Sequence, residues 1–325
     1  MIGETIMDVV GIDNPIVDML LHIDRIPHTN SFVEMKRYSF QGGGKVSTAL
    51  VALGRLGAET GMIGIVGKDS FGAFCIDDFK RHRVDTSKIK LIDNFNTPLS
   101  VCLVEKETSG RSFIIKLDHT RELMVEDLDE EYIASAKYLH LAFLSPVTIE
   151  AAKIARKYNV RVVIDADQYN EAVDENLKYI DILIGSEFFY KDACSKDCGY
   201  EENLRKLMKK GPSLLVITLG EKGCVCLEGD KYLEVPAFTG FEVVDTCGAG
   251  DVFHGAFIFG MLKGWDLGKT ARFSCAVSSI KCTMPGGRAG IPDYDMAERF
   301  LQDGTIDFTP LEERVNFYEK TILGG

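Results

Sequence analysis

The segment from Asp245 to Asp251 contains residue types that could bind an anion and accept a proton. It lies between a β-type run, Phe241–Val244, and a helical apolar pattern, Ala249–Lys263. Three residues would place backbone N–H groups at the start of that helix: Gly248, Ala249 and Gly250. Such groups converge on one point and bind anions, and glycine lets a ligand approach the backbone closely. In this first turn the helix dipole should keep the Asp251 carboxylate ionised, as a general base requires, although Asp251 could instead only cap the helix.

Two further glycine clusters could contact a ligand. Residues 42–44 precede Lys45, but Val46 follows where a Walker loop needs Ser or Thr, and no dinucleotide fingerprint is present. Three glycines still allow a ligand such as a sugar ring to approach the backbone. Residues 218–223 follow the apolar run Leu214–Thr218. Loops after strand ends line the ligand crevice of open α/β sheets, so this cluster is either such a loop or a surface hairpin turn.

Strand-like and helix-like patterns alternate along the chain. Strands are expected at 6–12, 61–66, 138–143, 161–164, 180–184, 214–218 and 224–227. Helices are expected at 47–56, 71–81, 146–158, 201–210 and 249–263. This alternation predicts an α/β fold with a largely parallel sheet covered on both faces, forming one domain over residues 1–325.

Two segments, approximately 17–40 and 97–116, interrupt this alternation. They contain short, partly polar strand patterns at Phe32–Arg37, Ser100–Glu105 and Ser112–Lys116. Thr108, Ser109 and Gly110 suit a hairpin turn between the last two. These segments could form a lid over a pocket, or an edge decoration of the main sheet.

The composition limits the classes of partner. With 37 basic and 49 acidic side chains, the 325-residue chain has a formal net charge of −12, which disfavours nucleic acid and anionic membranes. No basic, apolar leader or uncharged apolar run of membrane length is present in the sequence, so we expect a cytoplasmic protein. The nine cysteines are expected to be reduced thiols; a zinc site at Cys194 and Cys198 or at Cys224 and Cys226 is the alternative.

Taken in order, these motifs resemble the ribokinase-like, or PfkB, carbohydrate kinase family. The matching segments are Gly42-Gly43, Ala49, Ala52–Gly57, Gly64–Gly72, Asp245–Asp251, Arg272–Cys275 and Gly286–Pro292, and the resemblance spans roughly residues 6–300. It implies a three-layer fold with a mostly parallel central sheet and a small β-strand lid. It also implies MgATP as phosphoryl donor and a hydroxymethyl group of a sugar or nucleoside as acceptor.

The resemblance further implies roles for individual residues. Asp251 would be the catalytic base, and the amides of Gly248, Ala249 and Gly250 would form the anion hole. The substrate would contact Asn14, Asp18, Gly43 and Ser47, together with Asp251. ATP would lie along Ser186, Thr218, Gly220, Gly223, Gly250 and Cys275. Asp245 and the 281–290 loop would bind a monovalent cation, usually potassium, and Glu187 would reach Mg2+ through water.

The chain departs from the family pattern at several positions. Where the family has N-x-x-E, Ser186 takes the Asn position and the Glu moves to Glu187, which puts the magnesium arrangement in question. Ser47 and Cys275 each stand where relatives have Asn. Ala142 lies in the region where ribokinases place an acidic residue, which disfavours ribose. Asp165 and Asp167, at a strand end, could reach magnesium through water or the substrate, or could only cap the strand.

Four functions remain open at this point. The leading one is a sugar kinase; the others are a nucleoside kinase, a phosphosugar kinase of the 6-phosphofructokinase or tagatose-phosphate type, and a non-catalytic sugar sensor. A second phosphate would need cations, for which the candidates are Lys36, Arg37, Lys45, Arg111, Lys116 and Arg121. The Asn14–Asp18 stretch resembles the adenosine kinase version of its motif, whereas a sensor would have no need of the Asp251 base. An exposed lid edge could also pair two chains into a homodimer.

Overall fold

The computed structural model describes residues 7–108 and 110–320. Within them, nine strands form a central sheet in the order β13-β12-β11-β10-β9-β8-β1-β4-β5. Their bounds are β1 (Met7–Ile12), β4 (Thr60–Gly67), β5 (Val84–Ile92), β8 (Ala136–Leu141), β9 (Arg161–Ala166), β10 (Ile182–Ser186), β11 (Leu214–Thr218), β12 (Cys224–Glu228) and β13 (Lys231–Val235). Neighbours from β11 to β5 are parallel, and β12 and β13 add an antiparallel edge.

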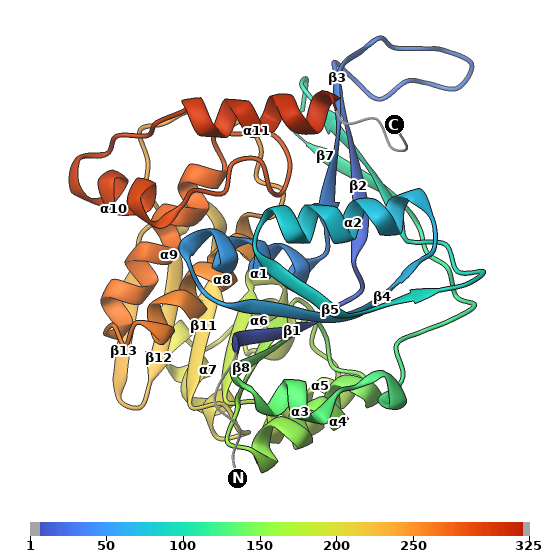
Figure 1. Cartoon of the computed structure of the whole chain (residues 1–325). Coiled ribbons are helices and arrows are strands. Elements are labelled where there is room, and N and C mark those ends of the chain that lie inside the picture. Colours follow the sequence, from blue (N-terminus) through green and yellow to red (C-terminus); the bar gives the residue numbers. More distant parts are fainter. Residues whose placement is uncertain (1–6, 109, 321–325) are drawn as a thin grey trace.

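Helices cover both faces of this sheet (Figure 1). One face packs against α1 (Lys45–Leu56), α2 (Ser70–Arg81), α8 (Ala249–Leu262), α9 (Leu267–Lys281), α10 (Tyr294–Asp303) and α11 (Thr309–Lys320). The other packs against α3 (Glu130–Ala134), α4 (Pro146–Lys157), α5 (Glu171–Asn176), α6 (Glu187–Ala193) and α7 (Tyr200–Met208). Single 3-10 turns lie at Val125–Asp127, Leu177–Tyr179 and Gly220–Lys222. Val9 and Val10 show the cause of this layering, since successive side chains of a strand enter opposite cores.

A second sheet stands to one side of the three layers (Figure 1). It has the strand order β3-β2-β6-β7, with β2 (Ile16–Ile23), β3 (Met35–Gly43), β6 (Leu99–Glu105) and β7 (Arg111–Lys116). β2 and β6 run parallel, while β3 and β7 pair antiparallel with them. The prediction of a three-layer α/β fold with a separate small sheet is therefore confirmed.

Two predicted strands differ from the structure, and one predicted turn lies partly outside the described residues. Phe241–Val244 forms no strand; instead, the N–H groups of Val244 and Asp245 both donate to Cys282 O in a loop. A β-type sequence becomes a strand only where a partner strand is available, and none is paired with it here. The strand expected at Phe32–Arg37 begins later, as β3. Ser109 of the expected hairpin lies outside the described residues, as does Ile6 at the start of the first expected strand.

Candidate active site

The carboxyl ends of the parallel strands gather polar side chains along one edge of the sheet. Asp13 follows β1, Asp165 and Asp167 lie at the end of β9, and Ser186 and Thr218 end β10 and β11. The register pairs Ser186 directly with Thr218, so these two residues are neighbours. This edge is where open α/β sheets bind their ligands, and two of the predicted ATP-side residues, Ser186 and Thr218, lie there.

The start of α8 has the geometry of an anion site. Gly248 is the N-cap residue with φ 72°, and a Cβ at this position would lie 2.9 Å from Gly287 Cα, so glycine is required. Gly250 follows in the first turn, where N–H groups have no partner within the helix. The Ala249 N–H, however, donates to Thr246 O at 3.2 Å. Of the three N–H groups predicted to form the anion hole, that of Ala249 already donates a hydrogen bond within the protein.

Asp251 lies in the first turn of α8, as predicted, but its ionisation differs from the prediction. The residue is only partly exposed to solvent. Burial raises the pKa of its carboxyl well above the usual value, and the neighbouring Asp165 carboxylate raises that pKa further. Lys45 opposes this effect. The position of Asp251 at the positive end of the helix dipole predicted an ionised carboxylate. Desolvation and the neighbouring Asp165 raise its pKa by more than the dipole lowers it. A raised pKa still suits a general base, which is most effective when it titrates near the working pH.

A partly buried charge cluster, in which Asp165 is buried and Lys45 and Asp167 are partly exposed, lies beside Asp251. Lys45 Nζ lies 2.9 Å from Asp167 Oδ2 and 3.5 Å from Asp165 Oδ1. Burial raises the pKa of Asp165 to about 7, while Lys45 lowers it. His254, one turn after Asp251, places Nδ1 3.8 Å from Asp165 Oδ2. The sequence had marked Lys45 only as a possible phosphate cation; its position in the first turn of α1, facing a strand end with two acids, was the available signal.

The predicted acceptor-side residues lie where β2 and β3 meet α1. Asp18 packs directly on Gly43, since a Cβ on Gly43 would approach Asp18 Oδ2 to 2.3 Å. Burial raises the pKa of Asp18 to about 6. Ser47 is fully buried and its hydroxyl donates to Asp13 Oδ2 at 2.9 Å. Asn14 is exposed beside them. The structure therefore brings Asp18, Gly43 and Asn14 to one junction but turns the Ser47 hydroxyl toward Asp13.

A cavity of about 600 Å³ adjoins the other side of the α8 start. It is lined by five of the predicted ATP-side residues: Thr218, Gly220, Gly223, Gly250 and Cys275. Phe253 and Phe241 contribute apolar walls, as an adenine ring would need. Ser186 is not in this lining; its hydroxyl accepts from Phe189 N at 3.2 Å and caps α6. Glu187 pairs with Lys191 at 3.1 Å on the same helix.

Asp245 is buried behind the glycine turn. Its two carboxylate oxygens accept hydrogen bonds from Cys247 N and Gly286 N, each at 2.8 Å. Arg111 of β7 places Nη1 3.7 Å from the same carboxylate, and Lys281 Nζ donates to the Asp245 carbonyl at 2.8 Å. Arg111 thus lies near the carboxylate and Lys281 occupies the carbonyl oxygen, so the predicted potassium site gains no support and remains a prediction.

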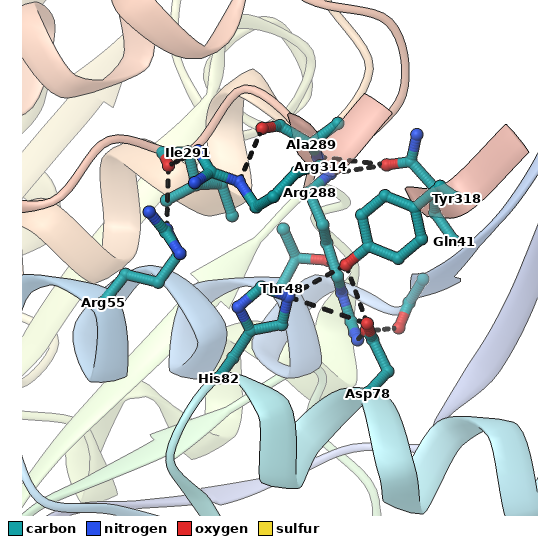
Figure 2. A network of polar contacts seen from close by, with 11 residues as sticks. Gln41, Thr48, Arg55, Asp78, His82, Arg288, Ala289, Ile291, Arg314 and Tyr318 are labelled. Atoms are coloured by element: carbon teal, nitrogen blue, oxygen red, sulfur yellow. Dashed lines mark hydrogen bonds and ion pairs between the residues drawn. The ribbon is translucent and has the colours of Figure 1, made fainter. Parts of the chain in front are cut away.

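A buried arginine that the sequence had not identified joins the acceptor-side glycines to this loop (Figure 2). Arg288 is 1% exposed, pairs with Asp78 of α2 and donates from Nη2 to Gly43 O at 2.9 Å. Its backbone N–H donates to Gln41 Oε1 at 2.9 Å. Tyr318 of α11 donates to Asp78 Oδ1 at 2.7 Å and so completes the network. Because the partners are far apart in the chain, no local motif signals this arrangement.

The chain resembles known proteins over most of its length. Residues 1–294 match the pfkB family carbohydrate kinase. The chain is 27% identical to the ketohexokinase of Mus musculus over 287 residues, covering 83% of this chain and 94% of that protein. It is 29% identical to the ribokinase of Haemophilus influenzae, covering 82% and 89%, respectively. It is 27% identical to the 5-dehydro-2-deoxygluconokinase of Clostridium perfringens, covering 83% and 86%.

Solved structures show the same fold. A putative ribokinase from Agrobacterium tumefaciens superposes with a TM-score of 0.80 at 22% identity, covering 93% of this chain and 99% of that chain. A putative ribokinase II from E. coli, solved in complex with ATP and Mg2+, gives a TM-score of 0.78 at 21% identity, covering 91% and 99%.

Proposed function

Since the chain belongs to the pfkB family of carbohydrate kinases, we propose that it transfers the γ-phosphoryl group of ATP to a hydroxymethyl group of a sugar. One observation carries the proposal: two adjacent residues at the start of α8 face two different sites. Gly250 lines the 600 Å³ cavity, while Asp251 interacts with the Lys45 and Asp165 cluster. A phosphoryl group on one side and a hydroxyl group on the other would meet at this turn.

In this mechanism Asp251 accepts the proton of the acceptor hydroxyl as its oxygen attacks the γ-phosphorus. A new oxygen–phosphorus bond forms, the bond between the γ-phosphorus and the bridging oxygen breaks, and ADP leaves. The N–H groups of Gly248 and Gly250 stabilise charge on the transferred group, aided by the helix dipole. Asp18 and the Gly43 backbone orient the acceptor, whose hydroxyl groups are donors that a carboxylate binds well.

Mg2+ would supply charge neutralisation on the ATP phosphates. The carboxyl edge of the sheet offers carboxylate oxygens for it, and Asp167 and Glu187 are exposed or half-exposed there. Both are paired with lysines, at 2.9 Å and 3.1 Å, so each would reach the metal through water after releasing its lysine. Ser186, beside Thr218, would contact the phosphate side of ATP.

The charges favour an acceptor without a second phosphate. Five of the six candidate phosphate-binding cations have carboxylate partners: Lys36, Arg37, Lys45, Arg111 and Arg121. The acceptor side is rich in acids: Lys45 acts electrostatically on Asp13, Asp165 and Asp251, and Asp18 lies against Gly43. A phosphosugar would add negative charge to this region, whereas a neutral polyol would not.

A substrate panel tests the proposal. ADP release would be followed with MgATP and a set of unphosphorylated sugars including ribose, matching sugar phosphates, and nucleosides. We expect turnover with at least one unphosphorylated sugar and little with its phosphate ester. Turnover confined to nucleosides or to sugar phosphates would contradict the proposed acceptor class, and no turnover at all would favour a sensor.

We also propose that residues 1–325 act as a single kinase domain located in the cytoplasm, with the second sheet as a lid. None of the described helices combines the length and apolar character that a membrane span requires. The lid has an exposed edge strand, β7, in which Phe113, Ile114 and Ile115 are each more than half exposed. We propose that β7 pairs two chains into a homodimer. Sedimentation should give a dimer for the wild type and a monomer for Ile114→Lys; a monomeric wild type would refute the pairing.

A further inference from the structure

Two cysteines from distant parts of the chain meet beside the proposed acceptor site. All nine cysteines lie within the described residues and are free thiols. Cys102 belongs to β6 of the second sheet, and Cys247 directly precedes Gly248, the N-cap residue of α8. The two thiols form a hydrogen bond with each other. This contact joins the sheet proposed as a lid to the helix start that carries the proposed base, and the proposed mechanism does not use it.

Cys102 lies on the face of the lid that presents Asp18 to the acceptor side. The register of β2 and β6 pairs Asp18 with Ser100 and Leu20 with Cys102. The Ser100 side chain hydrogen-bonds to Asp18, and side chains two positions apart in a strand share one face. Cys102 therefore follows Ser100 on this face, and it is 0% exposed.

Cys247 is the more accessible member of the pair. It is partly exposed, whereas Cys102 is fully buried. Its backbone N–H donates to Asp245 Oδ1 at 2.8 Å, which orders the turn before α8. Its thiol lies within electrostatic range of both Asp18 and Asp251. An oxidant small enough to enter the acceptor site would therefore reach Cys247 before Cys102.

We propose that Cys102 and Cys247 form a reversible disulfide in the presence of a hydroperoxide, and that this disulfide fastens the lid over the acceptor site. The Cys247 sulfur attacks the hydroperoxide: a sulfur–oxygen bond forms, the oxygen–oxygen bond breaks, and an alcohol leaves, or water when the oxidant is hydrogen peroxide. The Cys102 sulfur then attacks the Cys247 sulfenic acid, so that a sulfur–sulfur bond forms and water leaves with the thiol proton. The two sulfur atoms give up two electrons, which reduce the peroxide. A dithiol reverses the step by thiol–disulfide exchange and itself becomes a disulfide.

The disulfide would restrict the movement that admits a sugar. Thiols in hydrogen-bond contact need only a short approach to reach the S–S distance of about 2.05 Å. The bond would then hold β6 against the turn that carries Asp251, and a lid that cannot open excludes the acceptor. Neither cysteine lines the 600 Å³ cavity, so MgATP affinity should not change. The loss of turnover rests on the proposed kinase activity, whereas the formation of the disulfide does not.

Peptide mass spectrometry without reduction tests the disulfide directly. The wild type is treated with hydrogen peroxide and measured both before and after addition of dithiothreitol. Cys102→Ala and Cys247→Ser each remove one partner. The matched control is Cys198→Ser, which removes another partly exposed thiol, located between α6 and α7 and 3.1 Å from Lys206 Nζ. Each variant is compared with its own reduced form, so that differences in basal turnover cancel.

We expect a cross-linked pair of peptides containing Cys102 and Cys247 in the wild type and in Cys198→Ser, and in neither of the other two variants. Turnover of the preferred sugar should fall in proportion to the cross-linked fraction, and dithiothreitol should restore it. Amide hydrogen–deuterium exchange of residues 99–105 should decrease in the cross-linked protein, a measurement that needs no substrate.

Three results would overturn the proposal. The first is an oxidised wild type without a peptide pair containing both Cys102 and Cys247. The second is a disulfide between another pair, such as Cys224 and Cys275, whose sulfur atoms are 4.0 Å apart. The third is a cross-linked protein whose turnover, or whose exchange at residues 99–105, equals that of the reduced form. If the reduced wild type turns over no acceptor, the proposed function fails, and the peptide pair and the amide exchange still decide whether the disulfide forms and holds the lid.

Discussion

Lys45 and Asp167 form an ion pair of 2.9 Å that ties the first turn of α1 to the end of β9. The same ammonium lies 3.5 Å from Asp165, so Lys45 pairs with two carboxylates beside Asp251, the proposed base. Lys45 lowers the pKa of both Asp165 and Asp251, against the effect of burial. The ionisation of the site therefore depends on a lysine in the first turn of α1, outside the helix α8 that carries Asp251.

The pH dependence of turnover should follow from this pair. Activity requires the coupled Asp165 and Asp251 carboxyls to lose a proton, so kcat/KM should rise with pH through neutrality, since the pKa of Asp165 is raised to about 7. Lys45→Met removes a cation that lowers both pKa values, and the rising limb should move to higher pH. Asp165→Asn removes a negative charge and should move it to lower pH.

Initial rates from pH ~5.5 to ~9, with the sugar identified by the panel, measure these shifts. Lys68→Met is the control, because Lys68 forms an ion pair of 2.9 Å with Asp93 at the surface. Shifts in the same direction for Lys45→Met and Asp165→Asn would show that the electrostatic explanation is wrong.

Gly43→Ala should disable the acceptor side selectively. The new Cβ would meet the Asp18 carboxylate at 2.3–2.7 Å, and that carboxylate would have to move. A displacement of this kind can lower turnover ~100-fold while the nucleotide cavity, lined by other residues, keeps its MgATP affinity. Gly199→Ala, where a Cβ meets nothing within 4 Å, should behave as the wild type in both assays. If the acceptor KM and kcat of Gly43→Ala equal those of the wild type, Gly43 does not line the acceptor site.

Tyr318→Phe should increase the mobility of the glycine cluster at residues 42–44, although Tyr318 lies in α11. The missing hydroxyl removes one of the two buried donors to Asp78, and Asp78 holds the other, the Arg288 guanidinium that donates to Gly43 O. Amide hydrogen–deuterium exchange of residues 41–48 and 285–290 should increase. Tyr158→Phe removes a hydroxyl that donates to Glu130 at the surface of α4, and should leave both segments unchanged. If exchange in Tyr318→Phe increases only within α11, the proposed connection through Arg288 does not exist.

Local sequence signals predicted where several of the candidate site residues lie in the helices and strands. Glycine spacing placed Gly248 and Asp251 at a helix start, and the apolar run before it placed Thr218 at a strand end, where it lines the 600 Å³ cavity. These features depend on neighbours in the sequence, such as an αL glycine before a helix. Because these signals are local, the prediction of a strand at Phe241–Val244 was wrong. The residue types favoured a strand, but no partner strand pairs with this segment.

Features that depend on distant residues could not be predicted. The pKa of Asp251 is set by burial and by Asp165, which is 86 positions away in the sequence but close in space. Arg288 and Asp78 are separated by 210 positions, and a buried ion pair has no characteristic spacing. The buried Ser47 hydroxyl likewise reflects its contact with Asp13, which only the packing of α1 against β1 creates.

The central claim is that Asp251 accepts the proton of the acceptor hydroxyl. Asp251→Asn retains the shape of the side chain and removes its basicity, so turnover should fall by roughly two to four orders of magnitude. MgATP affinity, measured by titration on the same preparation, should stay within about threefold of the wild type, because Gly250 and the nucleotide cavity are intact. Turnover of Asp251→Asn equal to that of the wild type would contradict the claim.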